Sequence, residues 1–304
     1  MRRLGISAPR GTFSIVAADL EAGEVGCAVQ SRYFSVGSAV PWVRAGVGAV
    51  ASQASVVSVY GARALDELAA GATPEEALER VLAGDAERET RQLGAVTADG
   101  RAAAFTGAEC IDWAGHRVGA GFAAQGNILA GGTVVDEMAR AFGETDGPLV
   151  ERLVAALEAG QAAGGDRRGQ QSAAVVVERV GAASESREGI DRVCDLRVED
   201  HDEPIAELRR LVGIWHAWSA SRRAYWLHGA GRTAEAVTQM RNVLASDPDD
   251  ALVLYNLACL ESLAGERDEA LAHLGRAVAL DASYRELAAS DSDFDPMRDA
   301  LARL

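Results

Sequence analysis

The chain has 304 residues, 48% hydrophobic and 25% charged, which fits a globular protein of about two domains. Its formal net charge of −15 argues against nucleic acid or an anionic membrane as a partner, because both require a basic surface. No stretch reaches the roughly 18 apolar residues of a membrane span, and residues 1–10 lack the apolar segment of a secretory signal. The four cysteines show no CxxC spacing, so we expect reduced thiols and a cytoplasmic protein.

The first two thirds of the chain alternate between blocks of strands and blocks of helices. Apolar runs bounded by turn residues predict strands at 12–18, 24–31, 45–54, 91–107 (a hairpin around Asp99-Gly100), 172–180 and 191–200. Helical spacing predicts helices at 59–71, 73–85, 132–143 and 147–163, the second starting at Thr73 as N-cap. Because the blocks do not alternate strictly, we expect an α+β fold in which helices cover two antiparallel sheets packed face to face.

The last third reads as helical and contains an internal repeat. Residues 231–250 align with residues 265–284, so that Gly231 matches Gly265 and Ala236 matches Ala270. The offset of 34 residues is the period of tetratricopeptide (TPR) repeats. Because so few repeats rarely stand alone, we expect this module to contact a protein partner or a second copy of the chain, and hence a homo-oligomer. The expected divisions are an N-terminal extension or propeptide (1–11), an αββα domain (12–202) and a TPR-like domain (203–304).

The Gly11-Thr12 pair allows two interpretations. A threonine at a free N-terminus can act as a nucleophile, because its own α-amine, with a pKa near 8, accepts the hydroxyl proton. A preceding glycine suits self-cleavage, since it has no side chain to obstruct attack on its carbonyl. The dipeptide alone is equally consistent with a threonine that opens a β-strand.

Several ordered motifs strengthen the first interpretation. The segment "TFSIVAADLEAGEVGCAVQSRYFSVGSAVPW", followed by "GVGAVASQA", "VYGARALDEL", "QGNILAG" and "LEAGQAAGGDRRGQQSAA", resembles the DUF1028 family over residues 12–212. The resemblance implies an Ntn-hydrolase-like fold related to proteasome β-subunits, a four-layer αββα sandwich. It implies less about the reaction, since the substrate of the family is not established.

Matching the proteasome-like pattern onto the chain suggests the residues at one end of the sheets. Thr12 falls at the nucleophile, and Gln30, Ser31 and Arg32 fall where relatives place an aspartate that orients a lysine. Neither aspartate nor lysine is present there. Arg44 falls near the lysine position, where it would supply charge without shuttling protons, although it also fits a surface cation beside Trp42.

The resemblance suggests further polar residues. Ser52 and Gln53 fall near the oxyanion-hole amides of relatives, and Asp166 and Ser172 near a group that holds the N-terminus. The remaining candidate binding residues are Tyr60, Asn127 and Gln171. These residues also allow a purely structural interpretation. Residues 166–168 could form a solvated turn, and Gln53 and Gln171 could only satisfy backbone groups at strand ends.

The five histidines show no HExxH or paired spacing, so we expect no metal, no cofactor and no Ser-His-Asp triad. Two functional hypotheses follow. The first is an Ntn-type amidohydrolase that acts on a small molecule or short peptide, with Thr12 as nucleophile after removal of residues 1–11. The second is a non-catalytic ligand-binding or scaffold protein whose TPR-like module mediates protein interaction.

Overall fold

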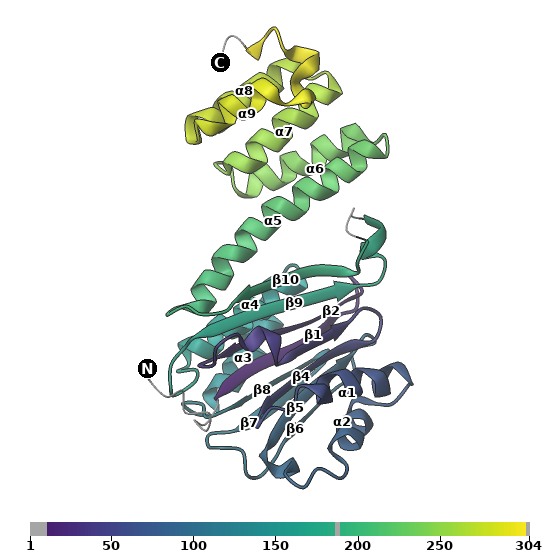
Figure 1. Ribbon diagram of the computed structural model, residues 1–304, viewed down its shortest axis with the longest axis vertical. Helices are drawn as coiled ribbons and strands as arrows, with labels where there is room; N and C mark the ends of the chain where they lie inside the picture. The colour runs from purple at the N-terminus through teal and green to yellow at the C-terminus, as the bar shows by residue number, and fades with distance from the viewer. Residues whose placement is uncertain (1–10, 186–188, 302–304) are drawn as a thin grey trace, which may run out of the picture. The chain divides into compact units, whose positions relative to one another are not determined.

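The structure, a computed structural model, describes residues 11–185 and 189–301 (Figure 1). Residues 1–10, which make up most of the expected N-terminal extension, lie outside this part. The chain forms two compact units, described separately below, with the first spanning residues 11–183 and 190–212 and the second mainly residues 213–301. The division falls at residue 212, inside the helix α5 (Pro204–Gly229), ten residues beyond the boundary expected from the sequence.

A six-stranded antiparallel sheet forms the centre of the first unit. Its strand order is β10-β9-β2-β1-β8-β7. The strands are β1 (Thr12–Asp19), β2 (Glu24–Ser31), β7 (Gly115–Gly119), β8 (Phe122–Asn127), β9 (Ser172–Arg179) and β10 (Arg192–Val198). The register sets Thr12 opposite Ser31 on one side and Asn127 on the other, and sets Ser31 opposite Ser172. The ends of four central strands therefore meet around Thr12.

The second sheet has four antiparallel strands in the order β3-β4-β5-β6. They are β3 (Pro41–Arg44), β4 (Gly48–Ala54), β5 (Arg91–Thr97) and β6 (Ala102–Thr106). The sequence predicts one strand over 45–54, and the structure instead has a β3–β4 hairpin. Gly46, at φ +72°, takes the left-handed conformation that this turn needs and that glycine adopts without steric cost.

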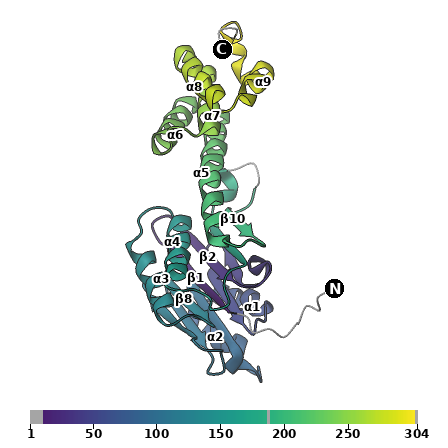
Figure 2. The same ribbon diagram turned by 90° about the vertical axis from the view of Figure 1, so that its left-hand side faces the viewer.

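Helices cover the outer face of each sheet. The pair α1 (Val59–Ala69) and α2 (Pro74–Leu82) packs on the four-stranded sheet, and the pair α3 (Thr133–Glu144) and α4 (Leu149–Ala162) packs on the six-stranded sheet (Figures 1 and 2). Between the sheets lies a buried apolar layer that includes Val16, Val29, Ala49 and Val96. Short 3₁₀ turns occur at η1 (Val36–Ser38), η2 (Arg88–Thr90), η3 (Ala182–Glu185) and η4 (Ser292–Met297). The expected mixed α+β class with two antiparallel sheets is confirmed.

The second unit is helical. After α5 it contains α6 (Thr233–Ser246), α7 (Ala251–Ala264), α8 (Arg267–Leu280) and α9 (Ser283–Ser290). Helix α7 packs against both α6 and α8, and Leu257, Leu260 and Leu274 are fully buried in the core. The first residues of α6 and α8 are 34 positions apart, as the internal repeat predicts. Across the described residues, no helix combines the length and apolar character needed to cross a bilayer.

Candidate active site

The Thr12 side chain lies between the two sheets, where the strand ends converge. Thr12 is only 4% exposed, and its Oγ1 donates a hydrogen bond to Ser31 Oγ at 3.0 Å. The Ser31 hydroxyl in turn donates to the carbonyl oxygen of Gly11 at 2.5 Å. Two hydroxyls thus form a short chain that begins at Thr12 and ends on the peptide bond preceding it.

The Gly11 carbonyl has a second donor. Arg168 Nη2 lies 2.6 Å from the Gly11 oxygen, so a charged group and a hydroxyl both polarise the Gly11–Thr12 bond. Asp166 holds the guanidinium in a bidentate pair, with Nε–Oδ1 at 3.1 Å and Nη2–Oδ2 at 2.7 Å. The carboxylate of Asp166 is fully buried and also accepts the backbone N–H groups of Arg32 and Arg168. The turn at 166–168 is therefore an ordered part of the site.

Behind Thr12, amide side chains extend the polar cluster between the sheets. Gln53 Nε2 approaches the Thr12 carbonyl at 3.4 Å and donates to Gln92 Oε1 at 2.8 Å. Asn127 Nδ2 donates to the same Gln92 oxygen at 2.9 Å. This packing fixes both β4 and β8 against the start of β1, and it places Asn127, a candidate binding residue, at the end of β8.

Ser14 links a third glutamine to the cluster. Its hydroxyl donates to Gln53 Oε1 at 2.6 Å and accepts from Gln125 Nε2 at 2.6 Å. Gln92, Gln125 and Arg168 are not among the site residues predicted from the sequence. The two glutamines interrupt apolar strands on the face that alternation directs inward, which is a usable signal. Arg168 carries no such pattern, since its partner Gly11 is 157 residues away.

Backbone strain also gathers around this cluster. Within the described residues, the non-glycine residues with left-handed φ are Ser35 (57°), Ala54 (66°) and Ile128 (54°). Ala54 follows Gln53, Ile128 follows Asn127, and Ser35 lies in the loop after β2. Such conformations cost about 1–3 kcal/mol each and concentrate at functional sites, so their placement agrees with a site at Thr12.

A small hollow reaches Thr12 from the loop after β2. Its lining includes Thr12, Tyr33, Val40, Gln53 and Ala54, and its volume is about 10 Å³. This is the space of about one water molecule.

Three expected residues lie away from the cluster. Arg44 forms an ion pair with Asp66 at 2.9 Å. It lies beside Gly48 at the start of β4, whereas Gln53 lies near the end of that strand. The cation that contacts Gly11 is therefore Arg168 and not Arg44. Ser52 directs its hydroxyl to the Val57 carbonyl, and its backbone N–H is already bonded to the Val40 carbonyl. It offers no free oxyanion donor.

Tyr60 is the third, and it lies in α1 on the outer face of the four-stranded sheet. Its hydroxyl donates to Asp85, which is paired with Arg91. Burial, followed by the bond to Asp85, raises the pKa of Tyr60, while the bond from Arg91 holds the pKa of Asp85 well below its usual range. This group stabilises the loop before β5.

The last expected residues hold the loops that surround the site. Ser172 Oγ donates to the Tyr33 carbonyl at 2.5 Å and accepts the Val36 N–H at 3.0 Å, so it fixes the loop after β2 rather than the N-terminal segment. Gln171 donates through its backbone to the Ser31 carbonyl and through its side chain to Asp200. Arg32 contributes its backbone N–H to Asp166, while its side chain is exposed.

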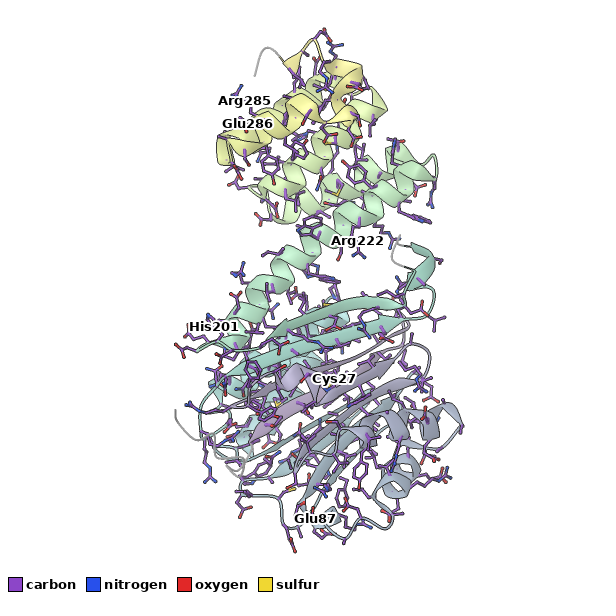
Figure 3. The ribbon with its side chains drawn as sticks, in the orientation of Figure 1. Cys27, Glu87, His201, Arg222, Arg285 and Glu286 are labelled. Carbon is purple, nitrogen blue, oxygen red and sulfur yellow. The ribbon has the colours of Figure 1, made fainter. Side chains whose placement is uncertain are left out.

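The cysteines do not offer a nucleophile near the site. Burial raises the pKa of the Cys27 thiol (Figure 3) and of the Cys194 thiol, and raises that of Cys110 to about 11. A protonated thiol is a poor nucleophile. In the helical unit, Cys259 lies beside Asp291 and Asp293, close enough for all three to hold a metal ion. Burial also raises the pKa of Cys259, and the two carboxylates accept the hydroxyls of Tyr225 and Tyr255, which is sufficient to explain the cluster.

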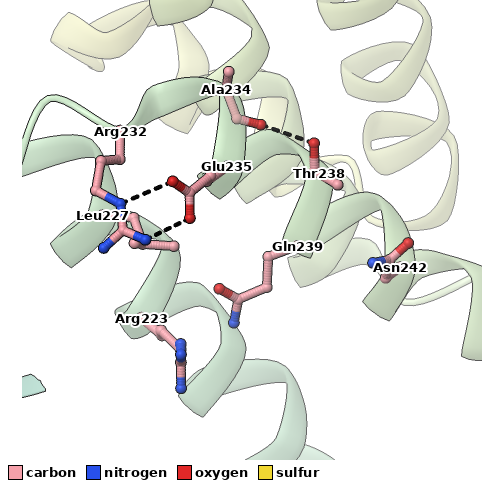
Figure 4. Close-up of a pocket in the computed structure, with 8 residues that line it drawn as sticks. All are labelled: Arg223, Leu227, Arg232, Ala234, Glu235, Thr238, Gln239 and Asn242. Atoms are coloured by element: carbon pink, nitrogen blue, oxygen red, sulfur yellow. Dashed lines mark hydrogen bonds and ion pairs between the residues drawn. The ribbon is translucent and has the colours of Figure 1, made fainter.

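An open groove of about 540 Å³ lies on the helical unit, between α5 and α6 (Figure 4). Its walls include Arg223, Leu227, Thr238 and Gln239, and Arg232 at its rim is paired with Glu235. All of the residues that line this groove belong to the helical unit.

A model of the family of unknown function DUF1028 matches residues 12–208. The chain belongs to the DUF1028 family. It is also similar to the crystal structure of protein SPO2555 from Silicibacter pomeroyi, described under the same family, with 34% identity and a TM-score of 0.62 over 70% of this chain and 90% of that one. None of the curated proteins matches.

The match to DUF1028 begins at Thr12 and ends near the start of α5. It therefore contains Thr12, Ser31, Asp166 and Arg168. Most of the helical unit lies beyond the DUF1028 segment.

Proposed function

We propose that this DUF1028 protein is an N-terminal-nucleophile amidohydrolase, whose nucleophile Thr12 is released by cleavage of the Gly11–Thr12 bond within the same chain. One observation carries the proposal. The Gly11 carbonyl oxygen accepts hydrogen bonds from Ser31 Oγ at 2.5 Å and Arg168 Nη2 at 2.6 Å, immediately beside the Thr12 hydroxyl. Donors aimed at the carbonyl oxygen of one peptide bond are what an oxyanion intermediate at that bond requires.

The self-cleavage has two steps. Thr12 Oγ attacks the Gly11 carbonyl carbon, and Ser31 accepts the Thr12 proton while giving its own proton to the Gly11 oxygen, whose developing negative charge Arg168 stabilises. The C–N bond then breaks as the proton on the Gly11 oxygen passes to the nitrogen, which becomes the free α-amine of Thr12, and Gly11 remains as an ester on Thr12 Oγ. Water hydrolyses the ester and leaves a carboxylate at Gly11 and a free hydroxyl on Thr12.

In turnover the same hydroxyl would attack the amide carbonyl of a small molecule or short peptide. The Thr12 amine, with an ordinary pKa near 8, would accept the proton and deliver it to the leaving amine. The packing of one helix pair on each sheet supports the Ntn-hydrolase-like sandwich on which this chemistry rests. Arg44 is paired with Asp66 and does not take the place of the lysine of proteasome-like sites. The cation that contacts the scissile bond is Arg168, which Asp166 holds in place.

The helical unit supports a second, separate role. Because α6 and α8 repeat at 34 residues, the TPR period, we propose a TPR-like module that binds a protein partner, within a cytoplasmic homo-oligomer. Light scattering tests the oligomer directly, and a monomer at micromolar concentration would contradict it.

The intact mass of the freshly purified chain, untagged at its N-terminus, tests the catalytic proposal. We expect a species that lacks residues 1–11 and starts at Thr12, and its accumulation should be abolished in Thr12→Ala. Thr145→Ala is the matched control, because it removes a threonine hydroxyl that only caps α3. A full-length mass that persists on long incubation would contradict the proposal and favour a non-catalytic binding or scaffold role.

A further inference from the structure

We infer that the Thr12 site accepts only acyl groups whose α-carbon carries no branch, such as glycyl or acetyl, because Asp166 occupies the space that a branch would need. The inference rests on the proposed function and specifies its substrate class. Asp166 sets this preference because its carboxylate blocks the space beside the α-carbon of the acyl group.

The evidence is the space around the Gly11 α-carbon. A Cβ added to Gly11 would lie 2.7 Å from both carboxylate oxygens of Asp166 and 2.8 Å from its Cγ. Contacts under 3.0 Å are essentially never tolerated by a Cβ, so one of the two groups must move. The contact with Asp166 is thus the obstacle to a side chain here.

Asp166 cannot yield easily. Its side chain is 0% exposed and is held by both arms of the Arg168 guanidinium. It also accepts the N–H groups of Arg32 and Arg168. Moving the carboxylate would break several charge-assisted hydrogen bonds in a buried place, where each broken bond is costly.

The chemistry transfers this restriction from the precursor to the substrate. Self-cleavage forms an ester between the Gly11 acyl carbon and Thr12 Oγ. Turnover forms an ester between the substrate acyl carbon and the same oxygen, with release of the amine, and water then hydrolyses it to a carboxylate. The two esters differ only beyond the acyl carbon, so the α-carbon of the substrate occupies the place of the Gly11 α-carbon, against Asp166.

The first experiment uses the processed protein and 7-amino-4-methylcoumarin amides of glycine, acetic acid, alanine and isobutyric acid. We expect the unbranched glycyl and acetyl amides to be hydrolysed about 10- to 200-fold faster than the branched alanyl and isobutyryl amides, the usual range for an overfilled pocket. In Asp166→Ala all rates should fall, but the ratio of unbranched to branched should move toward one. Equal rates for both classes in the parent protein would overturn the inference.

The second experiment follows self-cleavage, which needs no external substrate. Gly11→Ala should slow the appearance of the Thr12 N-terminus by a similar factor, whereas Gly143→Ala, at a position with open space, should not. Cleavage of Gly11→Ala at the parental rate would overturn the inference and leave the proposed function intact. Absence of cleavage in the parent chain itself would remove both.

Discussion

At the scale of single residues, the decisive feature is a carbonyl with two donors. A peptide carbonyl rarely needs a guanidinium partner, and Arg168 is held at Gly11 by a carboxylate that is fully buried. An arrangement of this cost is expected where charge develops during a reaction. Arg168 therefore belongs to the chemistry of the site as well as to its stability.

We expect Arg168→Met to slow self-cleavage by about 10²- to 10³-fold, the usual effect of removing one oxyanion donor. Arg168→Lys should recover little, because lysine cannot reproduce the bidentate pair with Asp166. Arg167→Met is the control, since that side chain bonds to the Asp112 carbonyl instead. The time course of the intact mass measures all three, and parental kinetics in Arg168→Met would assign Arg168 a structural role only.

His116 gives the fold a dependence on pH. Burial, followed by the charge of Arg117, lowers its pKa below the ordinary 6.5, and its Nδ1 lies 2.9 Å from Thr106 Oγ1. Because the unfolded chain binds the proton first as the pH falls, the free energy of unfolding is highest above pH 6.5 and decreases as the pH falls through the folded pKa. His116→Gln should flatten this decrease in urea titrations between pH 8 and pH 5. An unchanged slope would contradict the assignment.

At the scale of elements, the start of α2 and the hairpin around Asp99-Gly100 were predictable from the sequence, whereas the β3–β4 hairpin was not. The start of α2 at Thr73 is confirmed, because Thr73 and Glu76 exchange hydrogen bonds between side chain and backbone in a capping box. The β3–β4 hairpin was not predicted. Its turn depends on one positive φ at Gly46 within a run of small apolar residues that reads equally well as a single strand.

We expect Thr73→Ala to lower the free energy of unfolding by about 1 kcal/mol, the ordinary contribution of an N-cap. Thr73→Ser keeps the capping oxygen and should lose much less. Urea unfolding followed by circular dichroism measures both. Equal losses in the two variants would show that the methyl group of Thr73, and not its hydroxyl, supports the helix.

At the scale of the whole molecule, the sequence predicted the class of fold and the place of Thr12 but not the complete site. Strand patterns place Thr12 at the start of one strand and Ser31 at the end of the next, and the family resemblance is what selected them as site residues. Patterns carry no information on contacts between distant loops, so the cation was assigned to Arg44, whereas Arg168 meets Gly11 across 157 residues. The family resemblance supplied positions but could not supply these contacts.

Each compact unit has its own core, so thermal unfolding should show two transitions. Glu261 is fully buried in the helical unit and is paired with Arg241 and His273. Glu261→Gln should cost about 3 kcal/mol and lower one transition by about 10 °C or more, leaving the other in place. Glu235→Gln, at an exposed pair, is the control. A shift of both transitions together would show that the units unfold as one.

The contact between Thr12, Ser31 and Gly11 also determines how the rate of self-cleavage would depend on protein concentration. Every group at the scissile bond comes from one chain, so the rate constant should be first order and independent of dilution. Cleavage would then begin when folding brings these strand ends together, and it would need no activating protease. Cleavage followed at two protein concentrations a hundredfold apart should give the same half-time, and a faster reaction in the concentrated sample would instead indicate cleavage of one molecule by another.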